Sequence, residues 1–379
     1  MAAVIEKHSG QGKEPVALWL DCDTGHDVRP IVSDAFAILL SSCCPAVRVL
    51  GISTVYGNAS LDHTTYNTCA ILKAIGREDV DVYAGATKPF CRAAAHAPDI
   101  HGESGLDGTT CLTAPSVSAK SDKTAIEAMY AALILQPPGT AWLVATGALT
   151  NAALLFAVHP DLVNHIAGLS VMGGAIGDGF TDAPMGTVAG EGERIGNWTP
   201  WAEFNIYCDP EAAQAVFSNE PLAAKTTLIP LDLTHQMLAT REVRHALLYG
   251  GRTPSASADA PTPVRKLFQE ILVFFAQTYA DVFGLKDGPP LHDPLAVAAC
   301  FAPEIFEDIG GERFAVSVIT EGEHGVDTLV RGSSQCGRTV ATMLQVGQTG
   351  VRIPRKLDSR LLWEMLDRCL SVAEKRNKL

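Results

Sequence analysis

The chain has 379 residues, of which 47% are hydrophobic and 19% charged, a globular composition that excludes disorder as the main state. Its 42 acidic and 29 basic residues give a net charge of −13, and an acidic surface repels nucleic-acid phosphates. No apolar run reaches the roughly 18 residues that span a bilayer, and the first residues lack the apolar core of a secretory signal. We expect neither a nucleic acid nor a membrane as a partner.

The ten cysteines are scattered, and none forms a C-x-x-C pair. Several lie in apolar segments, where a thiol behaves as a small hydrophobic group. This usage is typical of a reducing compartment, so we predict a cytoplasmic protein without a disulfide framework or structural zinc.

Short, nearly continuous apolar runs alternate with helical patterns along the chain. Strands are expected at 16–20, 49–55, 80–84, 142–145, 166–172 and 226–231, and helices at 34–40, 62–75, 123–135, 149–158, 210–217 and 241–248. Continuous apolar strands are buried on both faces, and strand–helix alternation favours a parallel sheet. We predict an α/β fold with an open, mostly parallel, Rossmann-like sheet and helices on both faces.

The rest of the chain is expected to extend this single domain. A tail over 1–15 precedes the domain over 16–379, which ends with strands near 314–319, 326–330 and 339–345 and a helix near 359–374. Residues 250–263 are rich in Pro, Ser, Ala and Gly and predict an exposed loop. Glycine-rich residues 177–196 predict a second long loop of the kind that often covers a site.

An acidic turn follows the first predicted strand, where Asp21, Asp23 and Asp27 lie within seven residues. Like charges at this spacing are costly unless a cation neutralises them, and hard oxygen ligands favour calcium or magnesium. A solvated acidic turn is the alternative interpretation. Thr146 and Asn58 also follow predicted strands, and the carboxyl ends of parallel strands are where ligands bind in open α/β sheets. The alternative for both is an ordinary turn.

Two further polar motifs indicate a functional site only if the fold brings them close to this acidic turn. Asp293 follows His292 and precedes an apolar helix over 295–302, so helix capping is its plainest role. Glu203 and Asn205 are two residues apart and would share one side of an extended segment. Such a carboxylate and amide can hold two neighbouring hydroxyl groups. The alternative is a polar loop that caps the helix after Asp209.

Seven segments occur in an order that resembles the inosine–uridine-preferring nucleoside hydrolase family: DCDTGHD, ISTVYGNASLDHTTYN, IHGESGLDG, LVATGALTNAALL, VMGGA, NWTPWAEFNIYCDPEAA and LHDPLAV. The resemblance covers about residues 16–302. It implies a calcium-dependent enzyme of nucleoside salvage that hydrolyses the N-glycosidic bond of ribonucleosides, of the uridine or inosine type, to ribose and free base. It also implies a homodimer or homotetramer.

The resemblance assigns a role to each motif residue. Asp23 resembles the general base that activates water, and His292 a group beside the leaving base. Asp23, Asp27, Asp34, Thr146 and Asp293 resemble the metal ligands, Thr146 through its carbonyl. The residues that resemble substrate contacts are Asp27, Asn58, Met172, Asn197, Glu203, Asn205 and His292, and Asp21 resembles a supporting residue.

The chain departs from the family pattern D-x-D-x-G-x-D-D at one place. Residues 28–33 separate Asp27 from Asp34, and Pro30 disfavours a helix there, so we expect a bulging loop with Asp34 as the displaced metal ligand. Two other functions stay open. One is a ribose- or nucleoside-binding protein whose catalysis is lost through the insertion. The other is a phosphatase of the haloacid-dehalogenase type, which Asp21-Cys22-Asp23-Thr24 also fits. The preference between purines and pyrimidines is open too, with Tyr279 and Phe283 as candidates either for stacking on the base or for the core.

Overall fold

A computed structural model describes residues 14–25, 33–95, 112–188, 192, 194–250, 260–325 and 334–377. Its centre is a parallel sheet of six strands in the order β3-β2-β1-β4-β5-β6. The strands are β1 (Val16–Cys22), β2 (Val47–Thr54), β3 (Val82–Ala84), β4 (Ala141–Ala145), β5 (Gly168–Met172) and β6 (Thr226–Ile229). The predicted parallel α/β sheet is therefore confirmed, and it contains all six strands predicted between residues 16 and 231.

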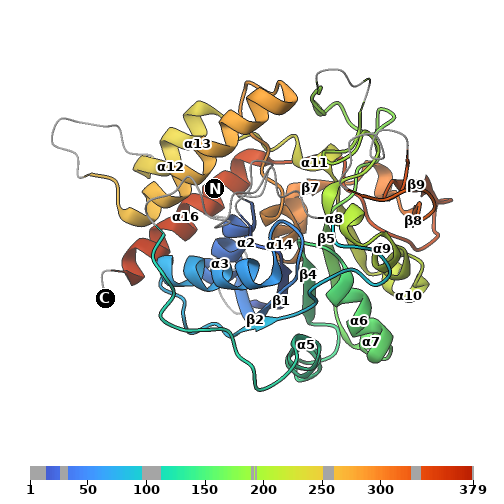
Figure 1. Ribbon diagram of the computed structural model, residues 1–379, viewed down its shortest axis with the longest axis horizontal. Helices are drawn as coiled ribbons and strands as arrows, with labels where there is room; N and C mark the ends of the chain where they lie inside the picture. The colour runs from blue at the N-terminus through green and yellow to red at the C-terminus, as the bar shows by residue number, and fades with distance from the viewer. Residues whose placement is uncertain are drawn as a thin grey trace.

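Helices cover both faces of the sheet, as predicted (Figure 1). One apolar core joins the sheet to α2 (Ser33–Cys43), α3 (Leu61–Ala74), α13 (Pro263–Phe283), α14 (Pro294–Phe301) and α16 (Ser359–Arg376). A second core joins the other face to α5 (Ala125–Ile134), α6 (Thr150–Val158), α7 (Leu162–His165), α9 (Pro210–Phe217) and α10 (Glu220–Ala223). The sheet is thus buried on both faces, which explains why its strands are almost wholly apolar.

Local signals in the sequence explain where several helices begin and end. Thr124 and Glu127 form a reciprocal capping box at the start of α5. Asp209 caps α9 through the N–H of Ala212, and Pro210 follows at the first helical position, where its missing N–H costs nothing. Gly284 ends α13 in the left-handed conformation, with φ of 68°.

The C-terminal part adds two small antiparallel pairs and the last helix. Strand β8 (Phe314–Val318) pairs with β9 (Thr339–Met343), and β7 (Phe306–Glu307) pairs with β10 (Lys356–Leu357). The strand predicted at 326–330 lies outside the described residues. Among the helices of the described ranges, none combines the length and the apolar character needed to cross a membrane.

The strand order places a switch point between β1 and β4, because the chain runs outward from β1 in one direction and from β4 in the other. In register, Asp21 of β1 lies beside Ala145 of β4, so the residues that follow both strands emerge together. Ligands in open α/β sheets bind beyond the carboxyl ends of the strands at such a point. The acidic turn after β1 lies at this switch point.

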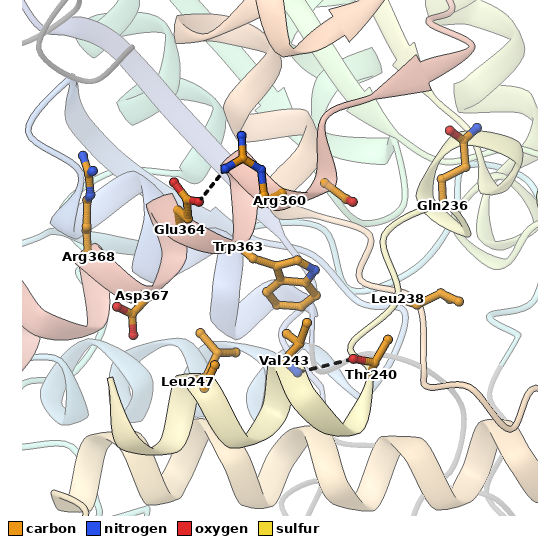
Figure 2. Close-up of a pocket in the computed structure, with 12 residues that line it drawn as sticks. Gln236, Leu238, Thr240, Val243, Leu247, Arg360, Trp363, Glu364, Asp367 and Arg368 are labelled. Carbon is orange, nitrogen blue, oxygen red and sulfur yellow. Dashed lines mark hydrogen bonds and ion pairs between the residues drawn. The ribbon is translucent and has the colours of Figure 1, made fainter. Parts of the chain in front are cut away.

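A pocket of about 700 Å³ lies elsewhere, between α12 (Arg241–Tyr249) and α16. Figure 2 shows Trp363 facing Val243 in it, with the charged side chains of Arg360, Glu364 and Asp367 along α16 to one side of the indole ring. None of the predicted site residues lines this pocket. The candidate site is therefore located from the contacts of its polar side chains and not from this pocket.

Candidate active site at the carboxyl ends of β1 and β4

Asp23 follows β1 and is fully buried. The backbone N–H of Asn58 donates to Oδ2 of Asp23 at 3.0 Å, and the side-chain amide of Asn58 donates to Oδ1 at 2.7 Å. The carboxylate lies between two glycines: a Cβ on Gly57 would lie 2.1 Å from Oδ2 of Asp23, and one on Gly147 2.8 Å from its Cγ. The backbone approaches Asp23 so closely that neither position accommodates a side chain.

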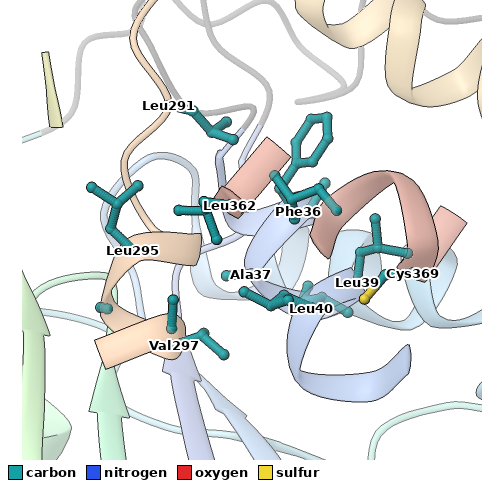
Figure 3. Packing of buried hydrophobic residues seen from close by; sticks show 14 of the residues in the cluster. Phe36, Ala37, Leu39, Leu40, Leu291, Leu295, Val297, Leu362 and Cys369 are labelled. Atoms are coloured by element: carbon teal, nitrogen blue, oxygen red, sulfur yellow. The ribbon is translucent and has the colours of Figure 1, made fainter. Parts of the chain in front are cut away.

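Asp34, the second residue of α2, reaches the same place in spite of the insertion. The hydroxyl of Thr146, which follows β4, donates to its Oδ1 at 2.9 Å. Its other oxygen, Oδ2, is buried without a hydrogen-bond partner. Helix α2 is fixed in the core, where Figure 3 shows Phe36 and Leu40 among side chains of α14 and α16. Packing of α2 therefore holds Asp34 at the strand ends.

Asp293 occupies the N-cap position of α14, yet its carboxylate makes no capping hydrogen bond. Its Oδ2 instead accepts a hydrogen bond from the hydroxyl of Ser33. The plainest expectation for Asp293, helix capping, is therefore wrong. A buried carboxylate left free of its own helix is available for another ligand.

The charge of Asp34 raises the pKa values of the other two carboxylates, Asp23 and Asp293. Burial, and then the charge of Asp34, raise the pKa of Asp23 well above its usual range, and the same two causes act on the pKa of Asp293. Burial raises the pKa of Asp34 to about 7, against the hydrogen bond from Thr146, which lowers it. Asp23, Asp34 and Asp293 thus lie near enough for their charges to interact strongly without a compensating cation.

The residues fit a hard divalent cation by their chemistry. The set of carboxylates and the Thr146 carbonyl consists of oxygen donors, and the buried Oδ2 of Asp34 lacks a partner. As the side chains are arranged, the described ranges contain no group of three acidic, histidine or cysteine residues placed to hold a metal ion. Asp27, the remaining predicted ligand, lies outside the described residues.

Asp21 is the last residue but one of β1, two residues before Asp23. Ser53 and Asn151 donate to its Oδ1, the latter at 2.8 Å, while Oδ2 has no partner. Burial raises the pKa of Asp21 to about 7, and these two hydrogen bonds lower it. Ser53 and Asn151 are supporting residues to which the sequence pattern assigned no role, although both stand inside segments that carry the family resemblance. Asn58, by contrast, contacts Asp23 rather than Asp21.

The segment with Glu203 and Asn205 is helical rather than extended, because α8 (Phe204–Cys208) begins directly after Glu203. The Glu203 carboxylate caps this helix and also accepts from the N–H of Gly174 at 2.9 Å. Burial raises the pKa of Glu203. The expectation of a shared extended side is thus wrong. Glu203 caps α8, and the helix after Asp209 is capped by Asp209 itself.

The Asn205 amide connects two predicted site residues. Its Nδ2 donates to the carbonyl of Thr146 at 2.9 Å and to that of Met172, at the end of β5, at 3.3 Å. Asn197 holds the start of α8, since its Oδ1 accepts from the N–H of Phe204 at 3.0 Å. Thr146, Met172 and Asn205 are therefore in one network, with Asn197 at its edge.

His292 is buried and engaged at both ring nitrogens. Thr234 lies 2.7 Å from Nδ1 and the Tyr279 hydroxyl 3.0 Å from Nε2. Burial, and then the neighbouring His235, lower the pKa of His292 well below its usual range, so the ring is neutral at pH 7. Thr234 and His235 lie on α11 (Leu231–Thr234) and just after it, and the sequence pattern gave no sign of either.

Tyr279 and Phe283, the candidates for stacking on the base, belong to the core of α13. Tyr279 is only 1% exposed, and its hydroxyl lies 3.0 Å from Nε2 of His292. The core alternative therefore describes both residues.

An open parallel sheet with buried carboxylates gathered at its switch point defines the class, an α/β protein with an acidic site beyond β1 and β4. The family model described as inosine-uridine preferring nucleoside hydrolase matches residues 18–364. The uridine nucleosidase of Saccharomyces cerevisiae is 41% identical over 285 residues, which cover 74% of this chain and 75% of that protein. The pyrimidine-specific ribonucleoside hydrolase RihA of Citrobacter koseri is 38% identical, covering 80% of this chain and 84% of the relative.

A solved structure shares the fold. The purine-preferring ribonucleoside hydrolase from Gardnerella vaginalis superposes with a TM-score of 0.74 at 24% identity, over 95% of this chain and 99% of that one. The chain belongs to the inosine-uridine preferring nucleoside hydrolase family and is an enzyme of this N-glycosidase family. This membership contradicts the phosphatase alternative.

Proposed function

We propose that the protein is a calcium-dependent ribonucleoside hydrolase that prefers pyrimidine ribonucleosides, uridine in particular, and releases ribose and free base. The observation that carries the proposal is the convergence of Asp23, Asp34 and Asp293 with Thr146 at the switch point of the sheet. The preference for uridine rests on the names of the two relatives that are 41% and 38% identical.

The metal would be held by Asp23, Asp34, Asp293 and the carbonyl of Thr146, with Asp27 as a further candidate ligand. When bound, calcium supplies charge that keeps the carboxylates ionised and a Lewis acid that favours ionisation of water. Asp23 is the general base in this proposal: it takes a proton from the water that attacks the anomeric carbon of the ribose. Two hydrogen bonds from Asn58 fix the orientation of this carboxylate.

The ribose would lie against the network of Asn205, Met172 and Asn197, with Asn58 and Glu203 beside it. Cleavage of a glycosidic bond develops positive charge on the sugar, and nearby carboxylates stabilise it. Interactions that strengthen as this charge develops lower the barrier.

His292 would assist departure of the base. Because its ring is neutral, it acts through hydrogen bonding rather than as a preformed imidazolium. One of its hydrogen bonds, to Thr234 or Tyr279, would exchange for one to the base.

Ribose release from uridine, cytidine, inosine and adenosine, measured with added calcium and with a chelator, tests the proposal. We expect turnover of uridine to exceed that of inosine and to disappear in the chelator. Equal turnover with and without chelator would contradict the calcium requirement, and absence of turnover of every nucleoside would contradict hydrolysis.

The same assay separates a second candidate, a binding protein without catalysis. That function needs the insertion to displace Asp34 from the site. The Thr146–Asp34 hydrogen bond of 2.9 Å favours the hydrolase instead. Binding of calcium and ribose by calorimetry without any hydrolysis would favour the binding protein.

A further inference from the structure

Ser33 is the last of the six inserted residues and the first residue of α2. It is 1% exposed, although it borders a segment that the sequence predicts to bulge outward. Its neighbour Asp34 faces Thr146. The end of the insertion therefore lies inside the candidate site.

The Ser33 hydroxyl is directed at a carboxylate that lies far away in sequence. It donates to Oδ2 of Asp293, 260 residues further along the chain. Asp293 makes no capping contact with its own helix. A contrast in the same helix is Ser41, equally buried, whose hydroxyl donates to the carbonyl of Ile38, as an ordinary helical serine does.

We propose that Ser33 is a positioning residue of the metal site, holding one oxygen of Asp293 so that the other is presented to the cation. This inference rests on the proposed function, because calcium is proposed there. Ligating carboxylates are commonly oriented by a hydrogen bond from a neighbour, and removing such a partner typically costs about 10–100-fold in metal affinity. In this account the insertion supplies part of the site.

The experiment measures calcium affinity by calorimetry on the metal-free full chain, with thermal melting as a check on folding. The variants are Ser33→Ala, Ser33→Gly, Ser33→Thr and the matched control Ser41→Ala. We expect the Ala and Gly variants at position 33 to bind calcium on the order of tenfold more weakly. The Thr variant keeps a hydroxyl and should restore the affinity, and the control should match the wild type within about twofold.

The glycine variant separates this role from a helix-start effect. If Ser33 acted only as a helix cap, the alanine variant would be affected and the glycine variant hardly at all, because glycine is nearly as good a cap as serine. A loss in the alanine variant alone would therefore overturn the inference, as would wild-type affinity in both variants. If the wild-type protein itself binds no calcium, the metal requirement of the proposed function fails and this inference with it. Equal binding by wild type and variants overturns only the inference.

Discussion

Asp34→Asn should change metal-free stability and calcium binding in opposite directions. The Asp34 carboxylate is buried beside Asp23 and Asp293, and one of its oxygens has no partner. In the metal-free protein its charge is unfavourable, so the neutral amide should stabilise the fold. With calcium, the same substitution removes a ligand, so the stabilisation that calcium gives to the wild type should largely vanish.

The size of the first effect follows from the pKa of Asp34. Burial raises this pKa from 3.8 to about 7. The shift of roughly three units corresponds to about 4 kcal/mol of unfavourable free energy at pH 8, at 1.36 kcal/mol per unit. This is an upper limit, because the new amide adds a donor beside the carboxylates. We expect Asp34→Asn to raise the free energy of unfolding by about 1–3 kcal/mol in a chelator at pH 8.

Denaturant unfolding in a chelator and in calcium measures both effects. Asp209→Asn is the matched control, because Asp209 is buried and accepts hydrogen bonds from Thr150 and the N–H groups of Phe90 and Ala212, none of which is a predicted ligand. It should lose stability equally in both media. If Asp34→Asn destabilised the metal-free protein as Asp209→Asn does, or kept the wild-type response to calcium, our reasoning about Asp34 would be refuted.

Three further predictions concern the same site. The pKa of Asp21 is about 7 in the fold, so Asp21 keeps its proton to a higher pH than in the unfolded chain. The free energy of unfolding of the metal-free protein should therefore fall as the pH rises from about 4 to 7. Asp21→Asn should reduce that fall by up to about 4 kcal/mol, as measured by chemical unfolding. Gly147→Ala should lower kcat at least tenfold, since the new Cβ would lie 2.8 Å from Cγ of Asp23. Gly192→Ala, whose new Cβ would have no described neighbour within 4 Å, should be neutral in the same ribose-release assay. His292→Ala should lower uridine turnover by about 10²-fold or more, and a rate within a few-fold of wild type would exclude its role.

The fold could be predicted because each strand is an apolar run between turn signals. The run at 142–145, for example, ends one residue before Thr146, as does β4. Helix α8 was missed, because five residues are too few to show a helical period and Glu203 and Asn205 carry the alternation of a strand.

The site could be predicted only in part. The acidic turn and the resemblance to the family indicated Asp23, Asp34 and Asp293, and the structure brings these three residues together. Partners such as Ser33 and Thr234 were not foreseen. Their contacts depend on how α2 and α11 pack against α14, which one sequence does not encode as a local pattern.

A crystal structure of the protein soaked in calcium would test the central claim most directly, through anomalous difference density at the switch point. We predict one peak bound by the carboxylates of Asp23, Asp34 and Asp293 and by the carbonyl oxygen of Thr146. A peak that lacks Asp34 among its ligands, or no peak beyond β1 and β4, would contradict it.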